Sequence, residues 1–134
     1  MYSLKEVQEK LMKGLLETIV LQLLSTSPMH GYQIITKIRR NFGVYFGPST
    51  IYPLLGSMEK SGYVKSEWDV TGERPRKVYK LTAEGQNLLQ ITEEYLNILC
   101  RKIGALGIPK LSEEEISHII TTPIIEKAKK TSKE

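Results

Sequence analysis

The chain has 134 residues, a formal net charge of +4, 40% hydrophobic residues and 25% charged residues, which is the composition of one ordinary globular domain. Its single cysteine, Cys100, excludes an intrachain disulfide scaffold. Charged residues interrupt the N-terminal segment, so it lacks the apolar run of a secretion signal, and no uncharged apolar stretch reaches the roughly 18 residues of a membrane span. We therefore expect a cytoplasmic protein without membrane contact.

Positive charge is concentrated in the middle of the chain. Residues 36–80 contain nine bases and four acids, a surplus of five, whereas residues 1–35 are neutral and residues 82–134 carry one net negative charge. Such a localised basic region is typical of proteins that bind a polyanion, because each phosphate neutralised by Lys or Arg releases counterions. The alternative is a basic face that is solvated and has no partner.

Three helices are predicted in the first half of the chain. The first covers residues 4–24, where apolar side chains three and four positions apart define one helix face: Leu4, Val7, Leu11, Leu15, Ile19 and Leu23. The second runs from about His30 to Asn41 and ends at Gly43. The third begins near Gly47 and Pro48, because proline is favoured at the first helical position.

A β-hairpin is predicted after the third helix. Residues 63–68 and 77–81 alternate between apolar and polar side chains, as half-buried strands do. The loop between them contains Arg74, Pro75 and Arg76, and Lys77 begins the second strand. Proline cannot donate to a strand ladder, so its position favours a loop. The hairpin therefore has a basic tip.

A long helix is predicted from Thr82 to about Leu106, followed by a short helix within residues 111–120. The long helix has an apolar stripe with a near-heptad repeat, which must pack against something, and a second copy of the chain is the simplest partner. The stripe on this helix supplies the expected homodimer contacts: Leu88, Tyr95, Leu99 and Ile103. We expect Cys100 to be a small apolar filler in this interface.

Three helices followed by a hairpin are the elements of a winged helix-turn-helix. The fold predicted is thus mainly α, with a winged-helix DNA-binding domain in residues 1–81 and a dimerisation helix with a helical tail in residues 82–134. In this fold the third helix enters a major groove and the wing lies along the backbone or a minor groove. The predicted double-stranded DNA contacts lie at the start of the third helix, on the wing and near the end of the second helix: Ser49, Thr50, Tyr52, Arg74, Arg76, Lys77, Lys37 and Arg40.

The chain also resembles the PadR family of winged-helix transcriptional regulators, from about Leu15 to Leu89. Several segments in the right order carry this resemblance, among them residues 29–34 (MHGYQI), 49–55 (STIYPLL), 59–63 (EKSGY) and 75–82 (PRKVYKLT). The resemblance implies a homodimeric repressor in which the long last helix packs with the partner's N-terminal helix, so Leu4 and Leu11 also belong to the expected interface. It also implies DNA contact by the wing and by the start of the third helix, including Tyr52. A dimer of this kind would read a pseudo-palindromic operator.

Two other function classes, a winged helix that binds only proteins and an enzyme, fit the sequence less well. A winged helix that only binds proteins has no need of a basic wing, which disfavours that alternative. An enzyme is disfavoured because the sequence shows no catalytic constellation, no glycine-rich phosphate loop and no metal-ligand spacing, so we expect no cofactor. His30 is expected to begin a helix, and His118 is too far from other ligand types to suggest a metal. A small-molecule effector bound near Trp68 and Tyr95 is left open.

Overall fold

The structure, a computed structural model, describes residues 3–107, 113–114 and 117. Its elements in chain order are α1 (Leu4–Thr26), β1 (Met29–His30), α2 (Gly31–Phe42), α3 (Pro48–Lys60), β2 (Val64–Asp69), β3 (Arg76–Leu81) and α4 (Ala83–Gly107). This confirms the mainly helical winged-helix fold with a long C-terminal helix. The chain divides into two units, Met1–Glu94 and Tyr95–Glu134, so residues of α4 belong to both. The short helix predicted within residues 111–120 lies mostly outside the described residues; Glu113, Glu114 and Ser117 are helical.

Local sequence signals explain where the helices begin and end. Ser3 caps α1 in a capping box with Glu6, which satisfies two backbone donors that have no partner within the helix. Gly43 ends α2 at φ 71°, a left-handed conformation that glycine adopts without steric cost. Gly47 precedes α3 without a side-chain cap, and Pro48 occupies the first turn, where a missing N–H costs nothing.

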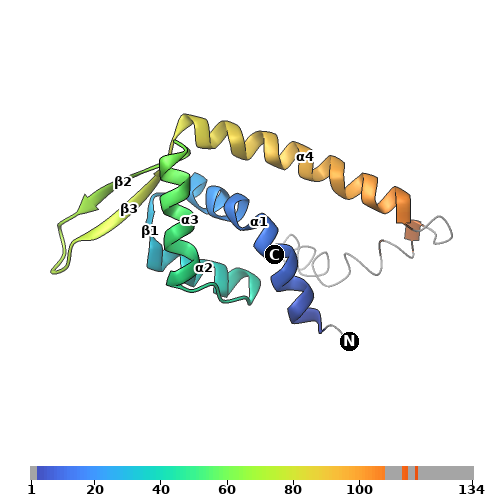
Figure 1. The fold of residues 1–134 in the computed structure, drawn as a ribbon, viewed down its shortest axis with the longest axis horizontal. Helices are drawn as coiled ribbons and strands as arrows, with labels where there is room; N and C mark the ends of the chain where they lie inside the picture. The colour runs from blue at the N-terminus through green and yellow to red at the C-terminus, as the bar shows by residue number, and fades with distance from the viewer. Residues whose placement is uncertain (1–2, 108–112, 115–116, 118–134) are drawn as a thin grey trace, which may run out of the picture. The chain divides into compact units, whose positions relative to one another are not determined.

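The hydrophobic core lies among α1, α2, α3 and the sheet, and Leu89 of α4 is also buried (Figure 1). α1 contributes Met12, Leu16, Val20, Leu21 and Leu24 to this core. In the first half of the predicted stripe, Leu4, Val7 and Leu11 are 75%, 42% and 64% exposed, so this part of the stripe lies outside the chain's own core. Leu4 and Leu11 are the α1 residues expected in the dimer interface.

The sheet has three antiparallel strands in the order β1–β3–β2. β2 and β3 pair from Val64 opposite Leu81 to Asp69 opposite Arg76, and this hairpin extends beyond the helices (Figure 1). Val64 and Trp68 lie four positions apart on one face of β2, yet Val64 is buried and Trp68 is 65% exposed. The two positions differ because Val64 pairs with Leu81 at the root of the hairpin, whereas Trp68 pairs with Lys77 near its tip.

Hydrogen bonds and a close backbone contact join the start of α4 to the root of the hairpin. The Thr82 hydroxyl donates to the Gly62 carbonyl at 2.7 Å and accepts from the Gly85 N–H at 3.0 Å. Gly85 is buried, and a Cβ built there would lie 2.1 Å from the Tyr63 carbonyl oxygen. Only glycine permits this approach, which fixes the hairpin relative to the first turn of α4.

Candidate nucleic-acid interface

One groove joins the start of α2, the first half of α3 and the hairpin. Its volume is about 580 Å³. It is lined by aromatic and basic side chains together with one proline: His30, Tyr32, Tyr52, Trp68, Arg74, Pro75, Arg76, Lys77 and Tyr79. Bases at the rim of an open groove suit a phosphate backbone, and aromatic faces suit sugars and bases. Four of the predicted DNA-contact residues, Tyr52, Arg74, Arg76 and Lys77, thus meet in one place.

Tyr52 is held in this groove by contact with the first residue of α2. A Cβ on Gly31 would lie 2.5 Å from Tyr52 Cε1 and 2.8 Å from its hydroxyl oxygen. The absence of a side chain at Gly31 therefore lets the phenol ring approach the α2 backbone closely. Tyr52 stays 44% exposed and lines the groove.

His30 connects α2 to the wing. Its Nδ1 lies 3.4 Å from the Gln33 backbone N–H donor, which makes it the N-cap of α2 as predicted, and the Gln33 side chain accepts from the His30 N–H at 3.1 Å. Its Nε2 lies 3.2 Å from Nη1 of Arg76 on β3. Desolvation, followed by the Arg76 charge, lowers the pKa of His30, while Asp69 on β2 acts in the opposite direction.

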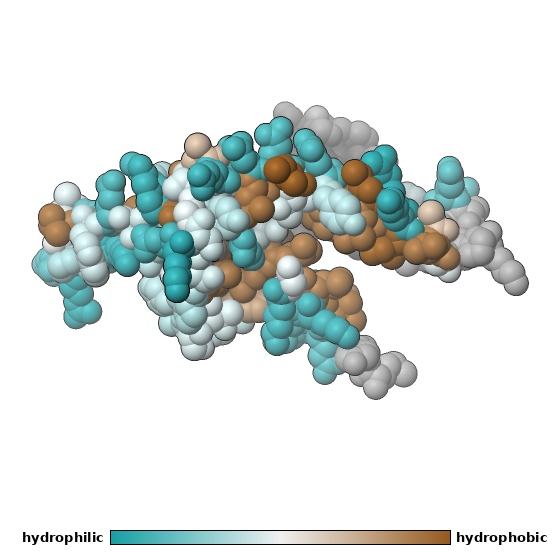
Figure 2. Space-filling view, turned by 45° about the horizontal axis from the view of Figure 1, so that its top comes forward, coloured by the Kyte–Doolittle hydropathy of each residue, from teal (hydrophilic) through white to brown (hydrophobic). Residues whose placement is uncertain are grey.

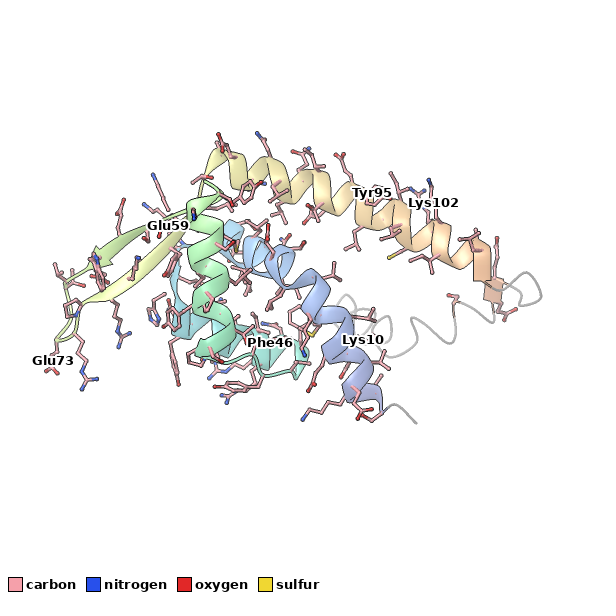
Figure 3. The ribbon with its side chains drawn as sticks, viewed as in Figure 1. Lys10, Phe46, Glu59, Glu73, Tyr95 and Lys102 are labelled. Carbon is pink, nitrogen blue, oxygen red and sulfur yellow. The ribbon has the colours of Figure 1, made fainter. Side chains whose placement is uncertain are left out.

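Lys77 is paired with an acid at the root of the hairpin. Its Nζ lies 3.6 Å from Oε1 of Glu59 and 5.9 Å from the centre of the Tyr79 ring. The Ser66 hydroxyl donates to the other oxygen of Glu59, which lies where α3 meets the hairpin (Figure 3). Burial, then the charge of Glu59, raises the pKa of Tyr79.

The hairpin tip carries charges of both signs. Asp69 accepts from the Thr71 N–H at 3.0 Å and from its hydroxyl at 2.6 Å, and these bonds lower the pKa of the Asp69 carboxyl. Both bonds use Oδ1 and tie this carboxylate to the turn. Glu73 lies at the end of the hairpin (Figure 3), beside Arg74. The tip is therefore basic through its guanidinium groups and also contains acids that oppose them.

The other predicted DNA contacts are placed differently. Ser49 and Thr50 are exposed in the first turn of α3 but do not line the groove. Lys37 and Arg40 lie in the second half of α2, a helix of 12 residues, so Arg40 is about 15 Å along the axis from His30. The structure separates these two bases from the groove that holds Arg74 and Arg76.

Sequence reasoning missed His30, Tyr32 and Trp68 as groove residues. His30 enters the groove because β1 pairs with β3, with His30 opposite Val78. A strand of two residues has too little alternation to be read from sequence. One sequence signal does mark two of these residues: His30 and Tyr32 lie in the segment MHGYQI, which is one of the segments that carry the resemblance to the PadR family.

The predicted dimer residues present apolar surface on α1 and α4. Leu4 and Leu11 are 75% and 64% exposed, and Tyr95 and Ile103 are 57% and 59% exposed. Figure 2 shows hydrophobic surface on both helices. Leu99 is 37% exposed. Leu88 differs, since it packs partly against the core of its own chain.

Among the described residues, no three His, Cys, Asp or Glu side chains gather as a metal site would require, and none of the described helices combines the length and apolarity needed to cross a bilayer. Cys100 is exposed.

Comparison with known proteins gives one consistent family. The model of the transcriptional regulator PadR-like family matches residues 20–91. Transcriptional regulator Rv3488 of Mycobacterium tuberculosis is 30% identical over 84 residues, which are 63% of this chain and 78% of that protein. A PadR family regulator from Eggerthella lenta has 34% identity and a TM-score of 0.71, covering 75% of this chain and 88% of that one.

A PadR-like transcription factor from Bacteroides fragilis has 29% identity and a TM-score of 0.65, covering 75% of this chain and 98% of the other. The family match spans α2, α3 and the hairpin, which are the elements that form the groove. The chain belongs to the PadR-like family of transcriptional regulators.

Proposed function

We propose that the protein is a homodimeric repressor that binds a pseudo-palindromic operator in double-stranded DNA through the groove between α3 and the wing. The observation that carries the proposal is the convergence of Tyr52, Arg74, Arg76 and Lys77 in that groove. Three bases from the wing meet a phenol from the helix that, in winged-helix proteins, enters the major groove. Repression then follows from occupation of a promoter site.

Two kinds of contact are expected within this interface. Arg74 and Arg76 bind backbone phosphates and set the register, while the exposed first turn of α3, with Ser49 and Thr50, reaches base edges. Because phosphate contacts release counterions, affinity for any duplex should fall steeply as the salt concentration rises. Affinity for the operator should fall in parallel and stay above that for unrelated duplexes.

The dimer is supported by the two apolar surfaces that the core leaves uncovered. Leu4, Val7 and Leu11 on α1 and Tyr95 and Ile103 on α4 are all more than 40% exposed. Exposed apolar patches of this kind mark protein interfaces. In a C2 dimer the two recognition helices would lie about 34 Å apart, one turn of the duplex.

Selection of bound sequences from a random duplex library tests the proposal. Recovery of an inverted repeat with half-sites about one helical turn apart is the expected result. Recovery of single, unrepeated sites would contradict the dimer, and the absence of any enrichment at low salt would contradict sequence-specific DNA binding. Light scattering on the same sample gives the mass independently: two chains of 15.3 kDa are expected.

A further inference from the structure

The contacts of His30 contain a conflict between hydrogen-bond donors. A neutral imidazole has one nitrogen that accepts and one that donates, and an arginine only donates. Yet Nδ1 faces the backbone N–H of Gln33 at 3.4 Å, and Nε2 faces Nη1 of Arg76 at 3.2 Å. At most one of these contacts is a hydrogen bond at any time. The other places a donor against a donor.

Protonation of His30 makes the conflict worse in the free protein. Both ring nitrogens then donate, and the ring carries a positive charge beside the Arg76 guanidinium. Asp69 on β2 opposes this repulsion, but its Oδ1 is already bonded to Thr71. The lowered pKa of His30 is consistent with this environment. An anion bound in the groove would face both side chains and would offset the repulsion that Asp69 offsets only in part.

We infer that His30 and Arg76 together hold one backbone phosphate of bound DNA, and that the His30 ring takes up a proton when the phosphate binds. The inference rests on the proposed function. A phosphate oxygen beside the two side chains would accept from Arg76 Nη1 and from His30 Nε2–H, so the two opposed donors would both be satisfied. The negative charge of the phosphate favours the protonated ring, even though its Nδ1–H then faces the Gln33 N–H. His30 is then a DNA-contact residue whose contribution depends on pH.

The surroundings of the ring fit this role. His30 is half-buried at the wall of the groove and open on the groove side. The other ionisable groups lining the groove are Arg74, Arg76 and Lys77 from the wing and the phenols of Tyr32, Tyr52 and Tyr79. Asp69 on β2 is the acid whose charge raises the pKa of the ring. Imidazole is the side chain whose ordinary pKa lies closest to neutrality, so a pH effect near neutrality points to histidine.

The sign of the effect follows from linkage. Binding of an anion raises the pKa of His30 above its lowered value in the free protein, so DNA-bound protein holds more protons between the two values. The affinity for DNA therefore increases as the pH falls below the pKa that His30 has in the DNA-bound protein. The increase levels off once the pH is below the pKa that His30 has in the free protein. Each half-site would gain up to about tenfold per pH unit inside this window.

The chain offers a matched pair of variants for the test. It contains two histidines, His30 and His118. His30→Asn keeps a good N-cap for α2, because asparagine also accepts from the helix backbone, and removes the titrating ring. His118→Asn removes the other imidazole. Binding of one labelled duplex is measured by fluorescence anisotropy from about pH 5.5 to about pH 8, the range in which histidine titrates, with circular dichroism as a check of folding.

We expect the affinity of the wild type and of His118→Asn to increase by about tenfold or more as the pH falls by two units, whereas His30→Asn stays flat. Calorimetry in buffers of different ionisation enthalpy should show net proton uptake by the wild type and none by His30→Asn. A pH-independent wild type, or a His30→Asn variant that keeps the pH dependence, would overturn the inference and leave DNA binding intact. A wild type that binds no duplex at any pH would overturn the proposed function itself.

Discussion

Lys77 and Glu59 form an ion pair between β3 and the last turn of α3, with Nζ 3.6 Å from Oε1. Both side chains are partly exposed, at 40% and 34%, so the pair is worth at most about 1 kcal/mol to folding. Its larger effect concerns the interface. Glu59 neutralises one of the three bases of the groove and holds it against the last turn of α3.

Removal of the Glu59 charge should strengthen DNA binding. Glu59→Gln keeps an acceptor for the Ser66 hydroxyl and frees the Lys77 ammonium for a phosphate. We expect affinity for any duplex to increase by roughly two- to fivefold, the equivalent of one weak ion pair, with a steeper salt dependence. Glu17→Gln on α1, an exposed residue, makes the same charge change away from the groove. Equal gains from both variants would contradict a specific role for Glu59.

Gly31 is expected to matter through Tyr52. A methyl group at Gly31 would overlap the Tyr52 ring at 2.5 Å, and the ring, which is 44% exposed, can swing away at little cost to folding. Gly31→Ala should therefore change the melting temperature by only a few degrees, the equivalent of about 1 kcal/mol, while lowering operator affinity as strongly as Tyr52→Ala does.

A double-mutant cycle separates this effect from general damage to α2. If Gly31→Ala acts only by displacing the phenol, it should cause no further loss in a Tyr52→Ala background, because residues in contact are not additive. Additive losses would show that Gly31 contributes to binding independently of Tyr52.

Gly85 is expected to be needed for folding rather than for binding. A Cβ at this position meets the Tyr63 carbonyl oxygen at 2.1 Å and Leu81 Cδ1 at 2.7 Å, so backbone must move. Gly85→Ala should destabilise the protein by about 2 kcal/mol or more in urea unfolding, as overpacking in a core does. Gly56→Ala on α3 has no atom within 4 Å of the new methyl group and should stabilise by about 0.5–1 kcal/mol. Equal effects would contradict the close approach.

The dimer prediction can be tested on the exposed face of α1. Leu11 is 64% exposed, so Leu11→Glu should leave the fold of one chain intact while placing a charge in the apolar interface. Sedimentation should then shift from two chains toward one at micromolar concentration. Gln8→Glu, also at an exposed α1 position, changes the charge equally and should remain dimeric. A Leu11→Glu variant that sediments as the wild type does would exclude this face from the interface.

The helices and the hairpin could be predicted because residues close to each boundary determine where the element begins or ends. Gly43 ends α2 and Pro48 begins α3, and the alternation of residues 77–81 identifies β3. β1 could not be predicted, since two residues become a strand only by pairing with β3 nearly fifty positions later. The sequence predicts that His30 begins a helix, and it is the N-cap of α2. Its contact with Arg76 on the wing depends on the pairing of β1 with β3, so the sequence does not predict it.

The faces of α1 show a second limit of sequence reasoning. Its apolar residues lie on more than one face, and spacing does not reveal which of them this chain buries for itself. The core uses Leu16, Val20 and Leu24, and leaves Leu4 and Leu11 exposed. In the candidate site, Arg74 and Arg76 of the wing and Tyr52 at the start of α3 were named from separate sequence features, and all three line one groove. Lys37 and Arg40 do not line it, because the groove meets α2 at its first turn and these bases lie in its second half.

Charge reversal in the groove tests the central claim most directly. Titration of a labelled duplex at low salt would compare the wild type with Arg74→Glu/Arg76→Glu and with Lys5→Glu/Lys13→Glu, which makes the same charge change on exposed positions of α1. We predict that the groove variant loses affinity by about a hundredfold or more, since two phosphate contacts become repulsions, while the α1 variant binds within a few-fold of the wild type. Equal affinity of the two variants would contradict DNA binding by this groove.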